Sequence, residues 1–416
     1  MLQCIRYFFG LPPNTTVTIH AKCKVQKSGY ECLAHYMTNH DGSVDLSQDK
    51  SIGGFYNGVE AMGFIWAMRP SLEKKVRSCF NVLKYWYTVF SFFCDVHYKS
   101  DLSQPTLAYP HLSIYCHMPN PVRIEIKQKG LRGTLFIPSG KGPFPGVITM
   151  VGGVAGTLEF KAALFASNGI AAFALAFFGI EGLQENLFAL DMAYFERAVN
   201  FMLSHEDVNA PNGIGVVGSC KGAQIAYSMA DCLSGIRCVV SSNGAPFALH
   251  NDHYHREKVW PCVSFKPYIF NDASLYSSAG GYIMRSLPDL PKDDNDPELG
   301  RSLFNFHKRL HVSYLVLTSL DDNNIPSEYF ANLVERLLKF AGHPSYKIMR
   351  YPGAGHLLDP PYSAFCRVAN FALINTITDF GGSTLQHSRA QEHSWNKILS
   401  FLHFHLNSAS ICLSNM

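Results

Sequence analysis

The stretch that most constrains the fold is residues 213–230, where a short apolar run meets a helix-compatible sequence. The run at residues 214–217 is too short for a helix and is bounded by glycines, which favours a strand buried on both faces of a parallel sheet. From Lys221 onward, apolar residues recur at helical spacing. The chain is therefore predicted to turn sharply from a strand into a helix between these two segments.

Glycines flank a cysteine at this turn. Gly218-Ser219-Cys220-Lys221-Gly222 has the form of a nucleophile elbow, G-x-S-x-G, with cysteine at the nucleophile position. A turn this sharp brings the backbones so close that a Cβ at either glycine would clash. The helix N-terminus at Cys220 favours the thiolate, which predicts a lowered thiol pKa. Two alternatives stay open: a buried structural cysteine at a βα turn, and Ser219 as nucleophile, one position out of the glycine register.

Composition excludes several classes of protein. A chain of 416 residues is long enough for two or three domains, and 47% hydrophobic with 16% charged residues is typical of a globular protein. The net charge of +3 is too small to indicate nucleic-acid binding. The 12 cysteines include no Cys-x-x-Cys pair and fit neither a zinc site nor a small disulfide scaffold. We therefore expect free thiols in a reducing compartment.

The sequence also bears on location. We expect no secretory signal at residues 1–10, and no stretch reaches the about 18 apolar residues that a membrane span needs. The last residues match the peroxisomal S-K-L address only at Ser414 and loosely at Met416. We therefore expect a cytoplasmic protein, with the peroxisome as the alternative, and no integral membrane segment. The oligomeric state is left open.

The first part of the chain is predicted to be a small β-sandwich. Residues 16–25 and 30–37 alternate apolar and polar side chains and are bounded by turns. Residues 52–70 are glycine-spaced and aromatic, which predicts a structured loop whose Trp66 packs against a neighbouring domain. Residues 71–108 are rich in aromatic residues without clear strand or helix periodicity, and no structure is assigned to them.

From residue 145 onward, short strands alternate with amphipathic helices. We expect strands at residues 147–151, 171–177, 214–217, 237–241, 314–318 and 346–350, helices at 159–167 and 192–203, and a helix at the end of the chain. This alternation predicts a mostly parallel sheet with helices on both faces. Residues 247–310 interrupt it and are predicted to be an insertion over the carboxyl edge of the sheet. The predicted division is an N-terminal domain at residues 1–120 and an α/β catalytic domain at residues 121–416.

A cysteine at an elbow needs a base and a group that orients the base. The strand at 314–318 leads into Asp321 and Asp322, and the strand at 346–350 leads into a glycine-rich loop ending at His356. The order nucleophile, acid, histidine is that of α/β-hydrolases, and ligands bind at the carboxyl ends of such sheets. His356 is therefore the candidate base, while the pattern alone does not separate Asp321 from Asp322.

An oxyanion hole requires two backbone N–H groups. The first expected donor is Lys221, which follows the nucleophile, and the second is Gly153 in the glycine-rich loop at residues 152–156. A plain tight βα turn is the alternative interpretation of this loop.

These motifs together resemble the acyl-CoA thioesterases related to bile acid-CoA:amino acid N-acyltransferase. The matching segments are residues 10–13, 42–46, 56–63, 142–146, 220–222, 228–230, 321–322, 327–332, 351–356 and 360–362. The resemblance implies an N-terminal β-sandwich, an α/β-hydrolase domain, and a triad of Cys220, Asp322 and His356. The choice of Asp322 rests on the spacing within the family. Residues 71–108 depart from the family, and most thioesterase members have serine in place of Cys220.

The resemblance implies that an acyl group passes from acyl-CoA to the cysteine. With water as acceptor the enzyme is a thioesterase releasing fatty acid, which we expect; with glycine or taurine it is an N-acyltransferase, which is the alternative. A general carboxylesterase and a non-catalytic hydrolase-fold binding module are further interpretations. We expect no metal and no separate cofactor, because coenzyme A is part of the substrate. The acyl chain length is left open.

Overall fold

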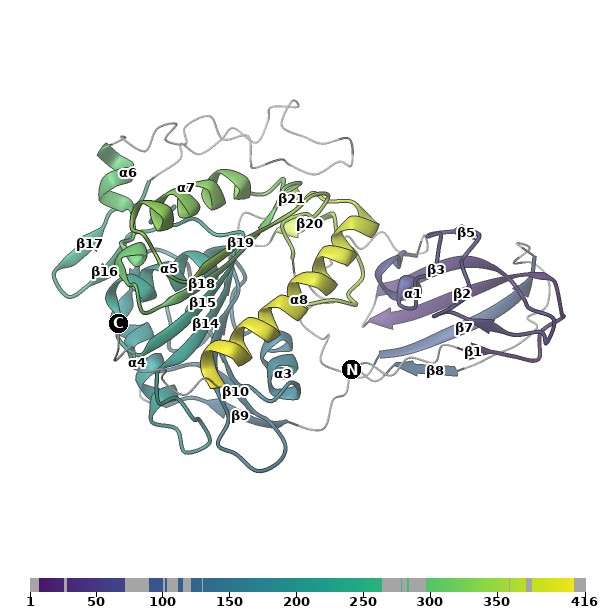
Figure 1. Cartoon of the computed structure of the whole chain (residues 1–416), viewed down its shortest axis with the longest axis horizontal. Coiled ribbons are helices and arrows are strands. Elements are labelled where there is room, and N and C mark those ends of the chain that lie inside the picture. The colour runs from purple at the N-terminus through teal and green to yellow at the C-terminus, as the bar shows by residue number, and fades with distance from the viewer. Residues whose placement is uncertain are drawn as a thin grey trace.

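The computed structural model describes residues 7–25, 28–71, 90–99, 102, 111–114, 121–128, 130–263, 278, 283, 297–358, 360–371 and 376–407. The described chain forms two lobes, a smaller one from the N-terminal residues and a larger one from residue 121 onward (Figure 1). Within this part of the chain, no helix is both long and apolar enough to cross a lipid bilayer.

The larger lobe is built on an eight-stranded sheet. Its strands are β9 (Val122–Ile126), β10 (Gly133–Ile137), β11 (Gly146–Met150), β12 (Ala171–Leu175), β14 (Ile214–Ser219), β15 (Ile236–Ser242), β18 (Ser313–Ser319) and β19 (Tyr346–Tyr351). Their order is β19-β18-β15-β14-β11-β12-β10-β9, and β10 alone runs antiparallel to its neighbours. The six strands expected after residue 145 are confirmed within two residues at each end. The sheet is that of an α/β-hydrolase.

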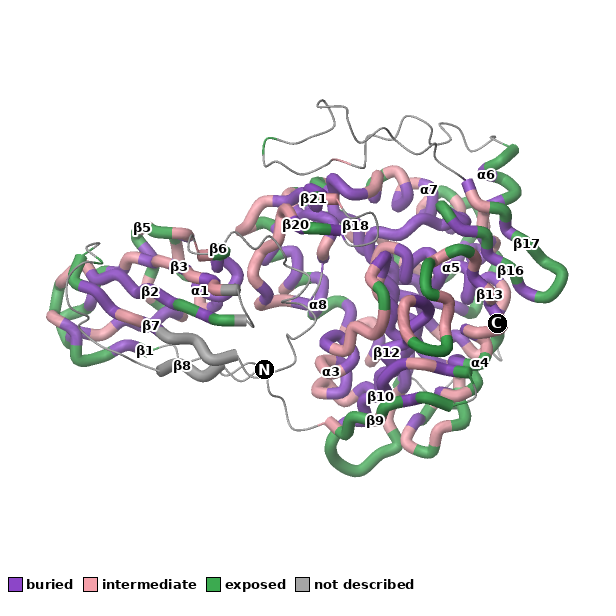
Figure 2. Tube along the Cα trace, turned by 180° about the vertical axis from the view of Figure 1, so that it is seen from behind, coloured by how far each residue is buried: buried purple, intermediate pink, exposed green. Residues whose placement is uncertain are grey.

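Helices cover both faces of this sheet, and the buried residues follow its central strands (Figure 2). One face carries α3 (Phe160–Ser167) and α8 (Thr384–Asn407); the other carries α4 (Met192–Leu203), α5 (Lys221–Cys232) and α7 (Ser327–Phe340). Strands such as β11 and β12 are buried along their whole length, which explains why they read as continuous apolar runs.

The segment at residues 247–310 does interrupt the alternation, although much of it lies outside the described residues. Its described elements are β16 (His253–His255), β17 (Lys258–Trp260), α6 (Pro297–Ser302) and the 3-10 helix η2 (Phe306–Lys308). Strand β16 pairs with β17 and with β13 (Leu190–Asp191), and η2 packs on α5. Further along the chain, β20 (Val368–Phe371) and β21 (Thr376–Asp379) form a hairpin that the sequence pattern did not predict.

The N-terminal lobe contains a six-stranded antiparallel sheet. Its strands are β2 (Thr16–Val25), β3 (Ser28–Met37), β5 (Gly53–Gly54), β6 (Arg69–Pro70), β7 (Phe90–Tyr98) and β8 (His111–Ile114), in the order β5-β3-β2-β7-β8 with β6 also on β3. A separate pair, β1 (Tyr7–Phe8) with β4 (Val44–Asp45), contributes Phe8 and Val44 to the core on one face of this sheet. The predicted loop at residues 52–70 also contains the short helix α1 (Gly63–Trp66).

Two expectations need correction. Part of residues 71–108, left without structure by the sequence pattern, forms β7, which pairs with both β2 and β8. Its alternation is clear only at its end, where Cys94 and Val96 face the core; most of the remaining segment lies outside the described residues. The expectation of free thiols throughout also fails, because Cys366 is disulfide-bonded.

The two lobes meet around Phe160, at the start of α3. Phe160 is buried in the core of the N-terminal lobe, and Leu158 and Leu385 pack against that core from the larger lobe. The backbone N–H of Phe365 donates a hydrogen bond to the carbonyl of Trp66 at 3.2 Å. Trp66 therefore packs within its own lobe, against Tyr56 with ring centroids 5.5 Å apart, and also touches the other.

Candidate active site

Cys220 lies at the junction between β14 and α5 with a backbone that L-residues rarely adopt. Its φ is 55° and its ψ is −119°, as a nucleophile elbow requires. Hydrogen bonds stabilise this strained backbone. The N–H of Cys220 donates to the carbonyl of Ser242 at 2.9 Å, and the carbonyl of Cys220 accepts from the N–H groups of Ala223 and Gln224, each at 3.1 Å. The half-buried thiol is thus presented above the carboxyl end of the sheet.

The flanking glycines have the steric role that the sequence predicted. A Cβ on Gly218 would lie 2.2 Å from the carbonyl oxygen of Gly222, and one on Gly222 would lie 2.4 Å from that of Met150. A third glycine, Gly152, comes against the nucleophile itself, since a Cβ there would lie 2.5 Å from the Cβ of Cys220. The turn therefore admits no side chain at any of these three positions.

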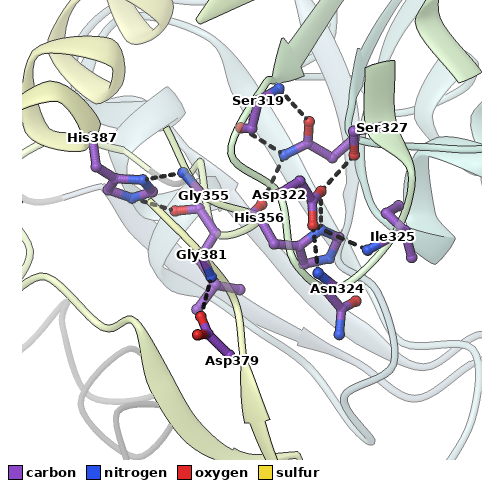
Figure 3. Close-up of polar contacts among 12 residues, drawn as sticks. Ser319, Asp322, Asn324, Ile325, Ser327, Gly355, His356, Asp379, Gly381 and His387 are labelled. Carbon is purple, nitrogen blue, oxygen red and sulfur yellow. Dashed lines mark hydrogen bonds and ion pairs between the residues drawn. The ribbon is translucent and has the colours of Figure 1, made fainter. Parts of the chain in front are cut away.

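Asp322 and His356 form a buried hydrogen-bonded pair, with 2.7 Å between the carboxylate Oδ2 and the imidazole Nδ1 (Figure 3). The carboxylate is also held by its own loop. Its Oδ1 accepts from the backbone N–H groups of Asn324 at 2.8 Å and Ile325 at 3.0 Å, and Oδ2 accepts from the hydroxyl of Ser327. Asp322 is therefore fixed in the orientation that meets the imidazole.

The neighbouring acid is turned away from this pair. Asp321 is exposed, and its backbone N–H donates to the carbonyl of Ala354 at 3.0 Å. The structure thus brings Asp322, and not Asp321, to His356, a distinction that the residue pattern alone did not make.

The loop that carries His356 is pinned from several sides. Its N–H donates to the carbonyl of Phe380 at 2.7 Å, and its carbonyl accepts from the side-chain amide of Asn243 at 2.8 Å. The preceding residue, Gly355, donates to Nδ1 of His387 at 3.0 Å (Figure 3). None of these supporting residues was predicted. Asn243 directly follows β15 at the carboxyl end of the sheet, and this position was the one sequence feature that could have indicated a role in the site.

The imidazole of His356 also lies beside the thiol of Cys220, so that each side chain shifts the pKa of the other. Burial raises the pKa of the Cys220 thiol, but the adjacent His356 and the backbone N–H of Lys221 outweigh it and leave the pKa below its ordinary value. Burial lowers the pKa of His356, and Asp322 and Cys220 outweigh it, so that this pKa lies well above its ordinary value. The site therefore favours a thiolate–imidazolium pair.

Ser219, the other candidate nucleophile, has a different environment. Its hydroxyl lies 2.7 Å from the amine of Lys161, which donates to it. Among the described residues, no hydrogen bond joins Ser219 to His356. The hydroxyl therefore lacks the general base that a nucleophilic serine needs.

Of the two predicted oxyanion donors, Lys221 directly follows Cys220, and Gly153 lines the pocket that contains the thiol. The backbone N–H of Lys221 helps to lower the pKa of the Cys220 thiol, whereas the side-chain amine of Lys221 donates to Oε1 of Gln224 at 3.0 Å and to the carbonyl of Leu249. Burial lowers the pKa of this amine to about 7. The roles of Lys221 and Gly153 as oxyanion donors stay predictions.

A pocket opens directly onto the thiol and the imidazole. Besides Cys220 and His356 its wall is mostly apolar, formed by Val151, Gly152, Gly153, Val154, Leu158, Phe160, Ser219, Asn324, Leu357, Leu358, Phe371 and Phe380. Such a wall suits an apolar acyl group whose reacting carbonyl lies at the thiol.

Comparison with known families covers most of the chain. Residues 190–408 match the family model described as BAAT / Acyl-CoA thioester hydrolase C terminal, and residues 8–127 match the Acyl-CoA thioester hydrolase/BAAT N-terminal region. The chain belongs to this family. The BAAT / acyl-CoA thioester hydrolase model for the C-terminal part includes Cys220, Asp322 and His356 within its matched range.

Relatives in this family carry names of two activities. The mouse bile acid-CoA:amino acid N-acyltransferase is 34% identical over 95% of this chain and 93% of its own length. The mouse acyl-coenzyme A amino acid N-acyltransferase 2 is 33% identical, with the same shares of the two chains covered. The mouse acyl-coenzyme A thioesterase 1 is 31% identical over 97% of this chain and 94% of its own length. The BAAT / acyl-CoA thioester hydrolase family thus includes both transferases and hydrolases.

Proposed function

We propose that this chain cleaves acyl-CoA thioesters through an acyl-enzyme on Cys220, and that water then releases the fatty acid. The observation that carries the proposal is the arrangement at the elbow, where His356 lies beside the Cys220 thiol in the same pocket and is hydrogen-bonded to the Asp322 carboxylate at 2.7 Å. Relatives named as acyl-CoA thioesterases support the substrate class.

Acylation begins with the thiolate of Cys220, whose proton is on His356. The thiolate attacks the thioester carbonyl and forms a carbon–sulfur bond, which gives a tetrahedral oxyanion. The backbone N–H groups of Lys221 and Gly153 stabilise this negative charge. The intermediate collapses as the bond to the coenzyme A sulfur breaks, and His356 gives its proton to that sulfur. Asp322 holds the imidazole in position throughout and stabilises its charged form.

Deacylation returns the site to its starting state. Neutral His356 accepts a proton from a water molecule, whose oxygen attacks the acyl-cysteine carbonyl. The tetrahedral intermediate then expels the Cys220 thiolate, and the fatty acid leaves. His356 retains the proton, so that the thiolate–imidazolium pair is restored.

A second candidate reaction uses the same acyl-enzyme with an amine as acceptor. The specific observation in its favour is the cysteine at the elbow, because an acyl-thioester stays activated toward amines. Exchange of an acyl group between two thiols is also nearly isoenergetic, so the intermediate keeps the activation of acyl-CoA. Relatives named as amino acid N-acyltransferases give further support. Glycine or taurine would then leave as an N-acyl conjugate.

One experiment tests the proposal and separates the two reactions. Purified full-length protein is incubated with a panel of acyl-CoAs, with and without glycine and taurine, and the products are identified by mass spectrometry. We expect free acid and coenzyme A in every active reaction. Amide formed only when an amine is present would instead establish the transferase.

The matched variants are Cys220→Ala and Ser219→Ala. We expect Cys220→Ala to abolish release of coenzyme A while the circular dichroism spectrum is retained, and Ser219→Ala to remain active. Comparable turnover by Cys220→Ala would contradict the proposed nucleophile.

A further inference from the structure

Three side chains of the N-terminal lobe gather outside the catalytic pocket. His20, Asp95 and His97 each offer one ligand atom, and these atoms lie within 4.8 Å of one another. His20 is on β2, whereas Asp95 and His97 are on β7, the neighbouring strand (Figure 1). The sequence pattern indicated no metal ligands, because the cysteine spacings fit no zinc site and residues 71–108 show no clear strand periodicity.

The strand register accounts for this convergence. His20 is directly opposite Asp95 in the antiparallel pair β2–β7, and Thr18 is opposite His97. Side chains two residues apart on a strand share a face, so all four point to the side away from the apolar core. The adjacent strand β3 adds a carboxylate, since Oε2 of Glu31 lies 3.0 Å from Nε2 of His20. The cluster therefore spans three strands on one face of the sheet.

His97 is a buried side chain whose polar atoms could bind a ligand. It is 6% exposed, yet neither of its ring nitrogens has a hydrogen-bond partner, and it is the one histidine among the described residues with both nitrogens in this condition. Thr18, directly opposite, does not serve it, because that hydroxyl donates to the carbonyl of Lys99. Two unpaired polar atoms in a buried ring are costly unless something binds them.

We propose that His20, Asp95 and His97 form a Zn²⁺ site on the N-terminal lobe. Two imidazoles and a carboxylate are ligands of the type that Zn²⁺ prefers. At bond lengths of about 2.0–2.1 Å a tetrahedral ion holds its ligand atoms about 3.3 Å apart, so that a modest contraction of the cluster suffices. Glu31 accepts the proton of one His20 nitrogen and leaves the other with a lone pair for the metal.

The bound ion would tie β7 to β2 and β3. A cation also changes the role of Lys22, whose amine lies 2.7 Å from Oδ2 of Asp95. Lys22 is 47% exposed at its side chain, so its amine can move into solvent when the carboxylate turns to the ion. The positive charge of Lys22 opposes metal binding, and its removal should strengthen it.

The test is titration of the full-length protein with Zn²⁺ alone, after chelator treatment, by calorimetry. Co²⁺ serves as a second probe, because its visible absorption reports tetrahedral coordination. We expect one equivalent of Zn²⁺ and a tetrahedral Co²⁺ spectrum. Glu31→Gln should weaken binding about 10–100-fold, as loss of an outer carboxylate does, and Asp95→Asn or His97→Gln should weaken it more. Lys22→Met should bind more tightly than wild type.

The matched control is His40→Ala, which removes an exposed histidine that contacts Asp41 at 2.9 Å on the same lobe. Its affinity and stoichiometry should equal those of wild type. Near-ultraviolet circular dichroism of each metal-free variant checks folding. Absence of a stoichiometric equivalent in wild type, equal binding by His97→Gln, or no gain in Lys22→Met would each overturn the proposal. Failure here would leave the thioesterase proposal untouched, because the catalytic pocket contains none of these residues.

Discussion

At the scale of single residues, the acidity of Cys220 distinguishes it from four buried cysteines of the described chain. Burial raises the pKa of Cys23, Cys94, Cys232 and Cys238 to about 12, which keeps them protonated at neutral pH. The pKa of Cys220 moves in the opposite direction because His356 lies beside it. Cys220 is therefore expected to react more readily than these four buried thiols.

We predict that iodoacetamide modifies Cys220 with a rate that rises with pH and levels off below the ordinary thiol range. The thiolate fraction grows as pH passes the thiol pKa, so a lowered pKa moves this rise to lower pH. His356→Ala should move it upward, because the neighbouring positive charge is lost. Peptide mass spectrometry across a pH series measures both rates. Identical profiles for the two proteins would show that His356 does not set the acidity.

The two adjacent acids should differ in their effect on catalysis. We predict that Asp322→Asn lowers the acylation rate by about 10²–10⁴, because the imidazole loses its orientation and the partner that stabilises its charge. A cysteine nucleophile places the loss toward the lower end, since a thiol needs less help than a hydroxyl. Single-turnover release of coenzyme A measures the step.

Asp321→Asn is the matched control. Its side chain is exposed and it contacts the active-site loop through the backbone, so the loss should be about tenfold or less. Equal losses in both variants would mean that the hydrogen bond from Asp322 to His356 does not carry the effect.

At the scale of elements, the turn from β14 to α5 depends on residues that have no side chain. We predict that Gly222→Ala lowers the free energy of unfolding by about 1–3 kcal/mol or more, because its Cβ meets the backbone of β11. Gly300→Ala in α6 is the control: nothing lies within 4 Å of its Cβ, and alanine should stabilise the helix by about 0.5–1 kcal/mol. Urea unfolding of both variants measures the difference. A wild-type midpoint for Gly222→Ala would contradict the steric role of the elbow.

Some of the helices and strands could be predicted from the sequence, and others could not. The buried parallel strands were predictable because each is a short apolar run bounded by turn residues, and the elbow because its glycines are obligatory. The strand β7 was not, because its few clearly alternating residues follow a run of aromatic ones. The hairpin β20–β21 was missed as well, and with it Phe380, which supports His356 through its backbone carbonyl. Any residue has a backbone carbonyl, so a contact of this kind cannot be predicted from the residue type.

The side chains that donate hydrogen bonds to Asp322 and to the His356 loop could not be predicted, for a related reason. Ser327 and Asn243 are ordinary residues in sequence, and they matter only because folding brings them to Asp322 and His356. The candidate nucleophile and the candidate base could be named from the sequence, because few residue types can perform these chemical roles. The choice between Asp321 and Asp322 needed either the family spacing or the structure.

At the scale of the whole molecule, Phe160 belongs to two environments. It is buried in the core of the N-terminal lobe and also lines the catalytic pocket. We predict that Phe160→Ala lowers the free energy of unfolding by about 3–5 kcal/mol and raises KM for acyl-CoA more than it lowers kcat. Phe340→Ala is the control, because that ring is 91% exposed at the end of α7. An unchanged KM in Phe160→Ala would show that this wall does not contact the acyl group.

The position of Phe160 also restricts how such a protein can be recombined. A chimera with the N-terminal lobe of a relative would keep Cys220, Asp322 and His356, yet it would repack the side of Phe160 that faces away from the thiol. Substrate preference could then shift without any exchange near the reacting atoms. Because Phe160 and Leu158 both contact the N-terminal core and line the pocket, a substitution in that core can change the shape of the pocket without touching the triad.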